Sequence, residues 1–299
     1  MSAARQALPA LILGAVLIGL APIFVRLAAV GPSAAAFWRL GLALPVLGLL
    51  LWRLPQPLPA PQAPAGLHWL WLAGLMFAAD LALWHQSIRF TSVANATLLA
   101  NLAPVFVTLA AWRLYDEHVT RRFAVGLVMA LAGAALLVAG SLRIGAQTAF
   151  GDLLAVAAAV FYAGYLLGVS RQRRVFGTLQ VMFWTTATGA VATLLLALAL
   201  GETLLPPAPR DWLILGALAL LSHVGGQGLI AYALAHLPAA FSSVSLLVQP
   251  VAAAVFAWVL LAEHFGAQQA AGGAVVLAGI VLCRLAMSRV PATGPVPPA

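Results

Sequence analysis

The sequence contains no lysine and few charged residues of any kind. All 15 basic residues are arginine, seven residues are acidic, and charged residues make up 7% of the 299 residues. A soluble domain carries about 25% charged residues. Because 64% of the residues are hydrophobic and the mean hydropathy is +1.04, the chain is expected to be a polytopic membrane protein and not a soluble one.

The sequence also lacks the patterns of several enzyme and binding classes. Its single cysteine, Cys283, cannot form an intramolecular disulfide, and the six histidines are scattered with no pair on one helix face for a metal. No Ser-nucleophile motif is evident. The arginines are spread along the loops instead of clustering with aromatic residues, so nucleic-acid binding is not expected. We expect no cofactor, no metal and no catalytic residue.

Long apolar runs are abundant. A membrane-spanning helix needs about 20 mostly apolar residues. The runs between Arg, Pro and Gly predict ten spans, at residues 8–28, 33–52, 68–88, 94–112, 122–140, 151–170, 178–200, 212–235, 239–261 and 267–287. The first run is too long for a signal-peptide core and is treated as an uncleaved span. The longest loop, 53–68, is Pro-rich and predicts an extended strap, and the tail at about 290–299 is expected to be disordered.

The arginines indicate the orientation, because cytoplasmic loops carry an excess of them. With a cytoplasmic N-terminus, four arginines face outward: Arg26, Arg89, Arg143 and Arg210. Ten face the cytoplasm: Arg5, Arg53, Arg113, Arg121, Arg122, Arg171, Arg173, Arg174, Arg284 and Arg289. Both termini are therefore expected to be cytoplasmic, in a protein of the bacterial inner membrane.

An internal repeat relates the two halves of the chain. NLAPVFVTLAAWRLYDEH (101–118) aligns with LVQPVAAAVFAWVLLAEH (247–264), so that Pro, Trp, Glu and His all match at an offset of 146. Each half, 1–146 and 147–299, carries five spans, and an odd number inverts the second half relative to the first. Inverted repeats are typical of secondary transporters, which bind substrate near the midplane between the halves. The expected fold is therefore all-α, with ten transmembrane helices as two inverted five-helix repeats.

These segments resemble the ten-helix EamA-type members of the drug/metabolite transporter superfamily. The resemblance covers nearly the whole chain and includes GLAPIFVRLA, AAAFWRLGLALPVLGLLL, SIRFTSVANATLLANLAPVFVTLAAWRLYDEHVT and YALAHLPAAFSSVSLLVQPVAAAVFAWVLLAEHFG. It implies transport of metabolites or drugs, often as efflux. Within the superfamily the chain is similar to YddG-like exporters of aromatic and other hydrophobic amino acids.

One carboxylate, Asp80, lies inside the third predicted span, just past the midplane. A charge at this depth normally faces a cavity or a partner. Arg39 in the second span lies at a similar depth, so a structural ion pair is one interpretation and a cavity-facing carboxylate that meets an ammonium or takes a proton is the other. The counterparts at offset 146 are Gly226 and Thr185, so only the first half carries this charge. The asymmetry argues mildly against a purely architectural role.

Other polar and aromatic residues are candidates for the substrate path. Trp84 shares a helix face with Asp80, and His85 follows it, although His85, Gln86 and Arg89 also fit an interfacial girdle. His223 and Gln227 lie one turn apart in span 8; the glycines beside them resemble a nucleotide loop, but in mid-helix they favour close packing or bending. The remaining substrate-binding candidates are Thr97, Asn101, Tyr162, Tyr165, Trp184, Ser245 and Gln249.

Four positions are predicted hinges. Pro104 and Pro250 occupy equivalent places near the midplane, and each proline leaves a backbone carbonyl one turn back without its amide partner. A static kink sealed by Ser and Thr side chains is the alternative. Pro22 and Gly164 mark a second pair, and Glu117–His118 and Glu263–His264 suggest latches at opposite membrane faces, with solvated charge as the alternative.

The sequence therefore predicts a transporter that works by alternating access, with a small amphipathic solute and the lipid bilayer as its partners. Amino-acid export is the first interpretation and efflux of organic cations the second, because aromatic rings and one carboxylate suit either solute. A membrane enzyme, a channel and a scaffold are less favoured. Small-residue stripes in spans 5 and 10 are compatible with a homodimer and with a monomer.

Overall fold

The computed structural model describes residues 3–55, 66–115, 117–142, 145–146 and 148–287. Within these ranges every regular element is a helix, and ten helical segments are long and apolar enough to cross a membrane. The predicted fold class, all-α with ten spans in two inverted repeats, is confirmed. Most of the predicted strap and the predicted disordered tail lie outside the described residues.

The ten spans agree with the predicted ones to within a few residues. They are Arg5–Leu27, Pro32–Arg53, Leu67–Ser87, Asn95–Tyr115, Arg121–Val138, Ala149–Gln172, Thr178–Ala199, Pro209–Ala233, Ala239–Leu261 and Ala267–Met287. Five of them are single helices: α5 (Leu67–Ser87), α8 (Arg121–Val138), α9 (Ala149–Gln172), α10 (Thr178–Ala199) and α15 (Ala267–Met287). The short 3-10 helix η1 (Ala139–Ser141) follows α8.

The other five spans are interrupted. Span 1 consists of α1 (Ala3–Ile18) and α2 (Ala21–Leu27), and span 2 of α3 (Pro32–Gly41) and α4 (Ala43–Arg53). Span 4 consists of α6 (Val93–Ala100) and α7 (Ala103–Tyr115), and span 9 of α13 (Ala239–Ser245) and α14 (Val248–Leu261). In span 8 the π-helix η2 (Leu218–Gln227) lies between α11 (Pro209–Ala217) and α12 (Gly228–Ala233). In spans 1, 2, 4 and 9 a proline follows the interruption within three residues, as expected from its missing amide hydrogen.

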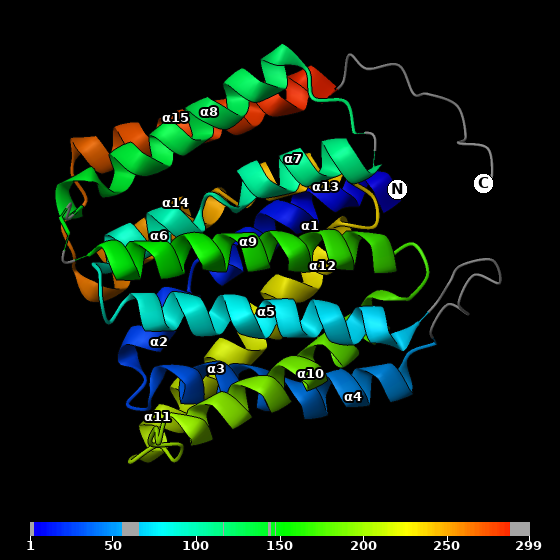
Figure 1. The fold of residues 1–299 in the computed structure, drawn as a ribbon, viewed down its shortest axis with the longest axis vertical. Coiled ribbons are helices and arrows are strands. Elements are labelled where there is room, and N and C mark those ends of the chain that lie inside the picture. Colours follow the sequence, from blue (N-terminus) through cyan, green and yellow to red (C-terminus); the bar gives the residue numbers. More distant parts are fainter. Residues whose placement is uncertain (1–2, 56–65, 116, 143–144, 147, 288–299) are drawn as a thin grey trace.

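Spans 5 and 10 form a pair at one edge of the bundle, at the top of Figure 1. Four glycines let α8 and α15 approach closely. A Cβ on Gly133 would lie 2.5 Å from the amide nitrogen of Val276, and one on Gly279 would lie 2.6 Å from the carbonyl oxygen of Gly126. Gly126 and Gly133 are related to Gly272 and Gly279 by the offset of 146, so the contact has the symmetry of the repeat. Such small-residue contacts replace the hydrophobic effect in lipid.

Spans 1 and 8 also make a close contact, which joins the first repeat to the second. A Cβ on Gly14 would lie 2.7 Å from the Gly226 carbonyl oxygen, and the Ser222 hydroxyl donates to the Leu17 carbonyl at 3.1 Å. Gly226 lies in η2, and long π-helical segments are rare in proteins and often lie at functional sites. Of the three HVGGQG glycines, Gly226 therefore serves close packing, as predicted, whereas a Cβ on Gly228 would meet nothing within 4 Å.

We call the membrane face where α1 begins the N-terminal face; it lies at the right of Figure 1. Spans 4 and 6 end at this face and span 9 begins there. Between the face and the midplane, α7, α9 and α13 pack through residues that are almost fully buried. These are Val107, Ala111, Leu166, Val169, Phe241 and Val244. The two repeats are therefore sealed together on this side.

Candidate functional site

A cavity of about 150 Å³ lies between the two repeats, from the midplane toward the face opposite the N-terminal face. The first repeat lines it with the second half of span 1, Arg39 of span 2, the second half of span 3 and the first half of span 4. The second repeat contributes residues from α9, η2, α13 and α14. A site between inverted repeats near mid-membrane is where transporters bind substrate.

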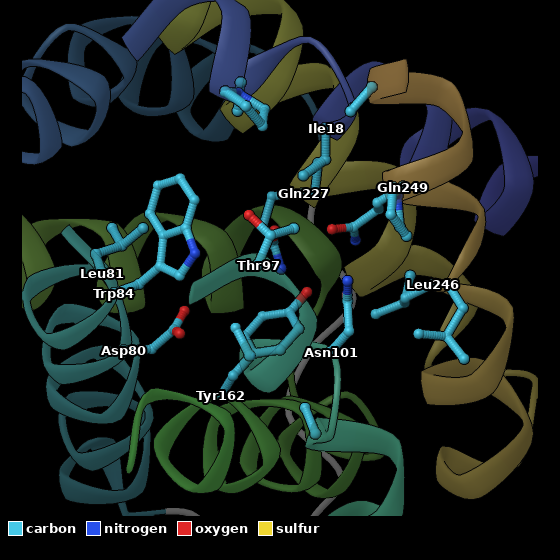
Figure 2. A pocket seen from close by; sticks show the side chains of 18 of the residues that line it. Ile18, Asp80, Leu81, Trp84, Thr97, Asn101, Tyr162, Gln227, Leu246 and Gln249 are labelled. Atoms are coloured by element: carbon cyan, nitrogen blue, oxygen red, sulfur yellow. The ribbon is translucent and has the colours of Figure 1, made fainter. Parts of the chain in front are cut away.

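Eight of the twelve predicted substrate-binding residues line this cavity: Asp80, Trp84, His85, Thr97, Asn101, Tyr162, Gln227 and Gln249. Figure 2 shows the Trp84 indole, the Asp80 carboxylate and the Tyr162 ring around one open space, with the amides of Asn101, Gln227 and Gln249 on the other side. Apolar side chains fill the gaps between these groups, among them Ile18, Leu81, Leu246 and Leu247. The surface suits a solute with an aromatic or aliphatic body and a polar head.

The Asp80 carboxylate points into the cavity (Figure 2), and Arg39 lines the same cavity. Among the described residues no salt bridge with an N–O distance of 4.0 Å or less joins Asp80 to Arg39. The interpretation of Asp80 as a cavity-facing carboxylate therefore fits this structure better than a closed ion pair. Asp80 can meet a cation or carry a proton at this position.

Phe77, which was not predicted as a site residue, connects the cavity to a layer of rings behind it. The Arg39 guanidinium carbon lies 5.7 Å from the centroid of the Phe77 ring. Tyr165 stacks on Phe77 with ring centroids 4.6 Å apart, and His223 stacks at 5.7 Å. Gln227 donates its amide hydrogen to the Tyr165 hydroxyl at 3.2 Å. The floor of the cavity is thus fixed by stacked rings.

His85 is buried and not part of a solvated girdle. Its Nδ1–H donates to the Leu81 carbonyl at 2.7 Å, and its ring lies edge-on to Trp84 at 5.0 Å. Its Nε2 is buried and has no hydrogen-bond partner among the described residues. Gln86 and Arg89, by contrast, bond to each other at the helix end. His85 therefore fixes the Trp84 indole and leaves one nitrogen free in the cavity wall.

The other four predicted binding residues do not line the cavity. Tyr165 lies behind Phe77, and His223 bonds through Nε2 to the Thr186 hydroxyl at 2.8 Å. The Ser245 hydroxyl donates to the Phe241 carbonyl at 2.9 Å, and Trp184 packs edge-on against Phe183. Helical periodicity could not separate these residues from the lining ones, because the rotation of each helix depends on packing against its neighbours.

Three of the four predicted hinge residues, Pro22, Pro104 and Pro250, line the cavity next to a helix interruption. Gly164 lies within the uninterrupted helix α9, where an added Cβ would meet Met76 Sδ at 3.3 Å. Ala100 and Leu246, four residues before Pro104 and Pro250, also line the cavity. Whether these positions bend during a transport cycle stays a prediction.

Glu117 joins the repeats at the N-terminal face. Its two carboxylate oxygens accept hydrogen bonds from the backbone amides of Ala239 and Ala240, at 2.9 and 3.1 Å, where α13 begins. The first amides of a helix have no partner within the helix and attract negative charge. Nearby, the Tyr115 hydroxyl donates to the Leu167 carbonyl at 3.0 Å. Glu117, a predicted latch residue, therefore connects the end of α7 to the start of α13 on this face.

Its repeat counterpart, Glu263, has a different partner at the opposite face. Glu263 forms a salt bridge with Arg26, and both side chains are exposed. The helix start equivalent to α13 is that of α6, where Ser92 caps the Asn95 amide and Asp152 accepts from the Asn95 side chain. The two ends of the molecule are thus connected differently, although the sequence repeats.

Comparison with known proteins agrees with this geometry. The sequence profile described as the EamA-like transporter family matches the chain twice, over residues 6–139 and 149–285. The chain belongs to the EamA-like transporter family. Each match covers five of the ten spans. The protein is therefore a membrane transporter that crosses the bilayer several times.

Individual relatives of this EamA-like protein are distant. An uncharacterized transporter of Archaeoglobus fulgidus is 27% identical over 271 residues, which cover 87% of this chain and 91% of the relative. A pseudopaline exporter of Pseudomonas aeruginosa is 26% identical over 242 residues, 81% of this chain and 82% of the relative. One crystal structure, at 20% identity, superimposes with a TM-score of 0.78 over 96% of this chain and 99% of that one, which shows a shared fold.

Proposed function

We propose that this protein is a secondary transporter that works by alternating access and exports aromatic or other hydrophobic amino acids across the bacterial inner membrane. The observation that carries the proposal is the cavity itself. It lies between the repeats and combines Trp84 and Tyr162 with the Asp80 carboxylate and three side-chain amides. The rings would stack on the apolar part of a solute, and the carboxylate would bind its ammonium group.

Alternating access is supported by the unequal ends of the molecule. The cavity is closed toward the N-terminal face by buried apolar residues and by Glu117 on the start of α13. The repeat predicts the opposite state, in which Glu263 would accept hydrogen bonds from the first amides of α6. In that state the hydrogen bonds of Glu117 to α13 would be broken. Inverted repeats that exchange conformations around a central site provide such a cycle.

Two observations support export as the direction of transport. The excess of arginine in the loops on the N-terminal face favours a cytoplasmic location for that face, so the structure corresponds to the outward-facing state. One relative is named an exporter, of pseudopaline. We therefore expect this chain to load its solute from the cytoplasm and release it outside.

The proposal is tested by counterflow in proteoliposomes loaded with unlabelled L-phenylalanine. Labelled phenylalanine should enter by exchange, saturate, and be recovered chemically unchanged. A channel would show no stimulation from the loaded side, and an enzyme would change the solute. Uptake with and without an imposed pH gradient shows whether protons are coupled. If no amino acid exchanges in vesicles that contain folded protein, amino-acid transport is wrong for this chain.

Efflux of organic cations is the second candidate, favoured by Asp80 among aromatic rings in the cavity. A cation needs the carboxylate and the rings and no group that binds an anion. Exchange of tetraphenylphosphonium in the same vesicles, without exchange of phenylalanine, would select this function.

A further inference from the structure

Arg39 places a guanidinium group inside the membrane, on α3 two residues before its end. The residue is 6% exposed and lines the cavity between the repeats. A charge at this depth is costly, and in membrane proteins it is kept where it has a partner or lines a pathway. The question is which partner compensates Arg39.

The described residues offer little compensation. The Nε of Arg39 is buried without a hydrogen-bond partner, and no side chain or carbonyl of the described residues accepts from its terminal nitrogens. Asp80, the other charged residue that lines the cavity among the described residues, attracts Arg39 at longer range but is not within salt-bridge distance. The Phe77 ring lies 5.7 Å from the guanidinium carbon, near the limit of a cation–π interaction. The guanidinium can therefore still bind an anionic group.

The architecture does not require a charge here. The counterpart of Arg39 at offset 146 is Thr185, which is buried in α10 and donates its hydroxyl to the Val181 carbonyl at 2.8 Å. A short uncharged side chain therefore fills the equivalent position of the second repeat. The charge of Arg39 calls for a reason specific to the first repeat, and the cavity is the feature that Arg39 contacts there.

We propose that Arg39 binds the carboxylate of the transported solute, so that the cavity selects zwitterions over simple amines. This inference rests on the function proposed above and specifies the substrate class of the same site. A guanidinium offers two parallel N–H donors that match a carboxylate, while Asp80 in the same cavity can bind an ammonium group.

The charges of the cavity favour a zwitterion over its relatives. A zwitterion places an opposite charge at both Arg39 and Asp80 and adds no net charge to the membrane interior. An amine without a carboxylate leaves Arg39 uncompensated, and a dianionic phosphate meets repulsion from Asp80. In a site of low dielectric constant, leaving one charge without an opposite partner costs more free energy than binding a zwitterion that pairs both charges. Apolar neighbours such as Leu81 and Leu246 then hold the side chain of the solute.

The test is competition for phenylalanine counterflow by compounds that lack one charge. Wild-type protein should be inhibited by L-phenylalanine at least about tenfold more strongly than by phenylethylamine, which has no carboxylate, or by N-acetylphenylalanine, which has no ammonium group. Phenyl phosphate should compete no better than these two. Arg39→Gln should weaken inhibition by phenylalanine about tenfold or more. It should leave inhibition by phenylethylamine unchanged or make it stronger, because no uncompensated charge remains, so the preference is lost. Arg39→Lys should keep part of the preference.

Arg89→Gln is the matched control, because Arg89 is an exposed arginine that bonds to Gln86 and lies outside the cavity. Retained inhibition by phenylethylamine shows that Arg39→Gln is folded. Equal inhibition of wild-type protein by phenylalanine and phenylethylamine, or an equal loss of both in Arg39→Gln, would overturn the inference and leave the transporter in place. Absence of exchange for every probe in wild-type protein would instead refute the proposed function, and the inference with it.

Discussion

Replacement of Glu117 by alanine is predicted to open the N-terminal face of this transporter. Glu117 follows α7 of the first repeat and accepts from two backbone amides of α13 in the second, at 2.9 and 3.1 Å. Both bonds are specific to the state in which this face is closed, because they need α7 and α13 in contact. The substitution should therefore weaken the closed state without touching the cavity, which does not include Glu117.

The magnitude follows from the two bonds. A hydrogen bond to a charged group contributes about 1.5–3 kcal/mol net, but Glu117 is partly exposed and solvent weakens each bond. We expect a combined loss of about 1–2 kcal/mol, which changes the ratio of the closed to the open state by about 5- to 30-fold. Helix α13 also loses a negative group at its first turn, which acts in the same direction.

The assay is the reactivity of one engineered thiol. Ala111→Cys, at a fully buried position of α7 in the sealed half, reports opening in a Cys283→Ala background that has no other thiol. Its rate of labelling by a membrane-impermeant maleimide from the N-terminal face should rise about 5- to 30-fold in Glu117→Ala. Glu117→Gln, which keeps one acceptor without the charge, should give a smaller rise.

Glu263→Ala is the matched control, because Glu263 is the repeat counterpart at the other face and pairs with Arg26 there. If Glu263 serves the opposite state, its loss should not speed labelling at Ala111→Cys and should slow turnover. Equal labelling rates in wild-type protein and Glu117→Ala, with both proteins folded, would show that these bonds do not hold the gate and would refute the reasoning.

Three further predictions concern packing, the carboxylate and the aromatic wall. Gly133→Ala should lower the thermal unfolding temperature in detergent, because its Cβ would lie 2.5 Å from a backbone nitrogen of α15. The expected loss of stability is about 1–3 kcal/mol. Gly216→Ala, whose Cβ meets nothing within 4 Å, should not lower the unfolding temperature. Asp80→Asn should abolish any response of uptake to a pH gradient, and an unchanged response would end the idea that Asp80 carries a proton. Trp84→Leu should raise the KM for phenylalanine about 2- to 10-fold, whereas Trp184→Leu, outside the cavity, should leave it unchanged.

The spans could be predicted from the sequence because a bilayer imposes a strong and simple constraint. Each crossing needs about 20 apolar residues with all backbone groups satisfied internally, and the ten runs satisfy it. The interruptions near Pro104 and Pro250 follow from the missing amide hydrogen of proline. The π-helical course of residues 218–227 was not predictable, because no residue there imposes it; it accompanies the close contact between Gly14 and Gly226.

The cavity could be predicted only in part. Asp80 can be identified from the sequence because a carboxylate inside an apolar run needs an explanation. Arg39 can be identified in the same way, although only as a partner of Asp80. Phe77 carried no signal, since an apolar residue in a span is expected everywhere. Tyr165 and Trp184 are predicted site residues from their residue type and their depth in the spans, and the packing of their helices turns them away from the cavity.

The second repeat has no counterpart of the Asp80 carboxylate, and the reason lies in a contact between the repeats. Asp80 of the first repeat corresponds to Gly226 of the second, where an added Cβ would lie 2.8 Å from Ile18 Cγ1 and 3.1 Å from the Gly14 carbonyl oxygen. A carboxylate there would separate span 1 from span 8. The second repeat instead supplies the amide of Gln227, one residue further on, to the same cavity.

Gly226→Asp is therefore expected to break the joint between the repeats and not to create a symmetric site. The larger side chain overpacks a backbone contact and buries a second carboxylate, each of which costs about 1–3 kcal/mol or more. Size-exclusion profiles and thermal unfolding in detergent measure this loss, with Gly228→Ala, whose Cβ meets nothing within 4 Å, as the control in the same span. A Gly226→Asp protein with wild-type stability would mean that the second repeat can carry the carboxylate, and that packing does not explain why Asp80 has no charged counterpart.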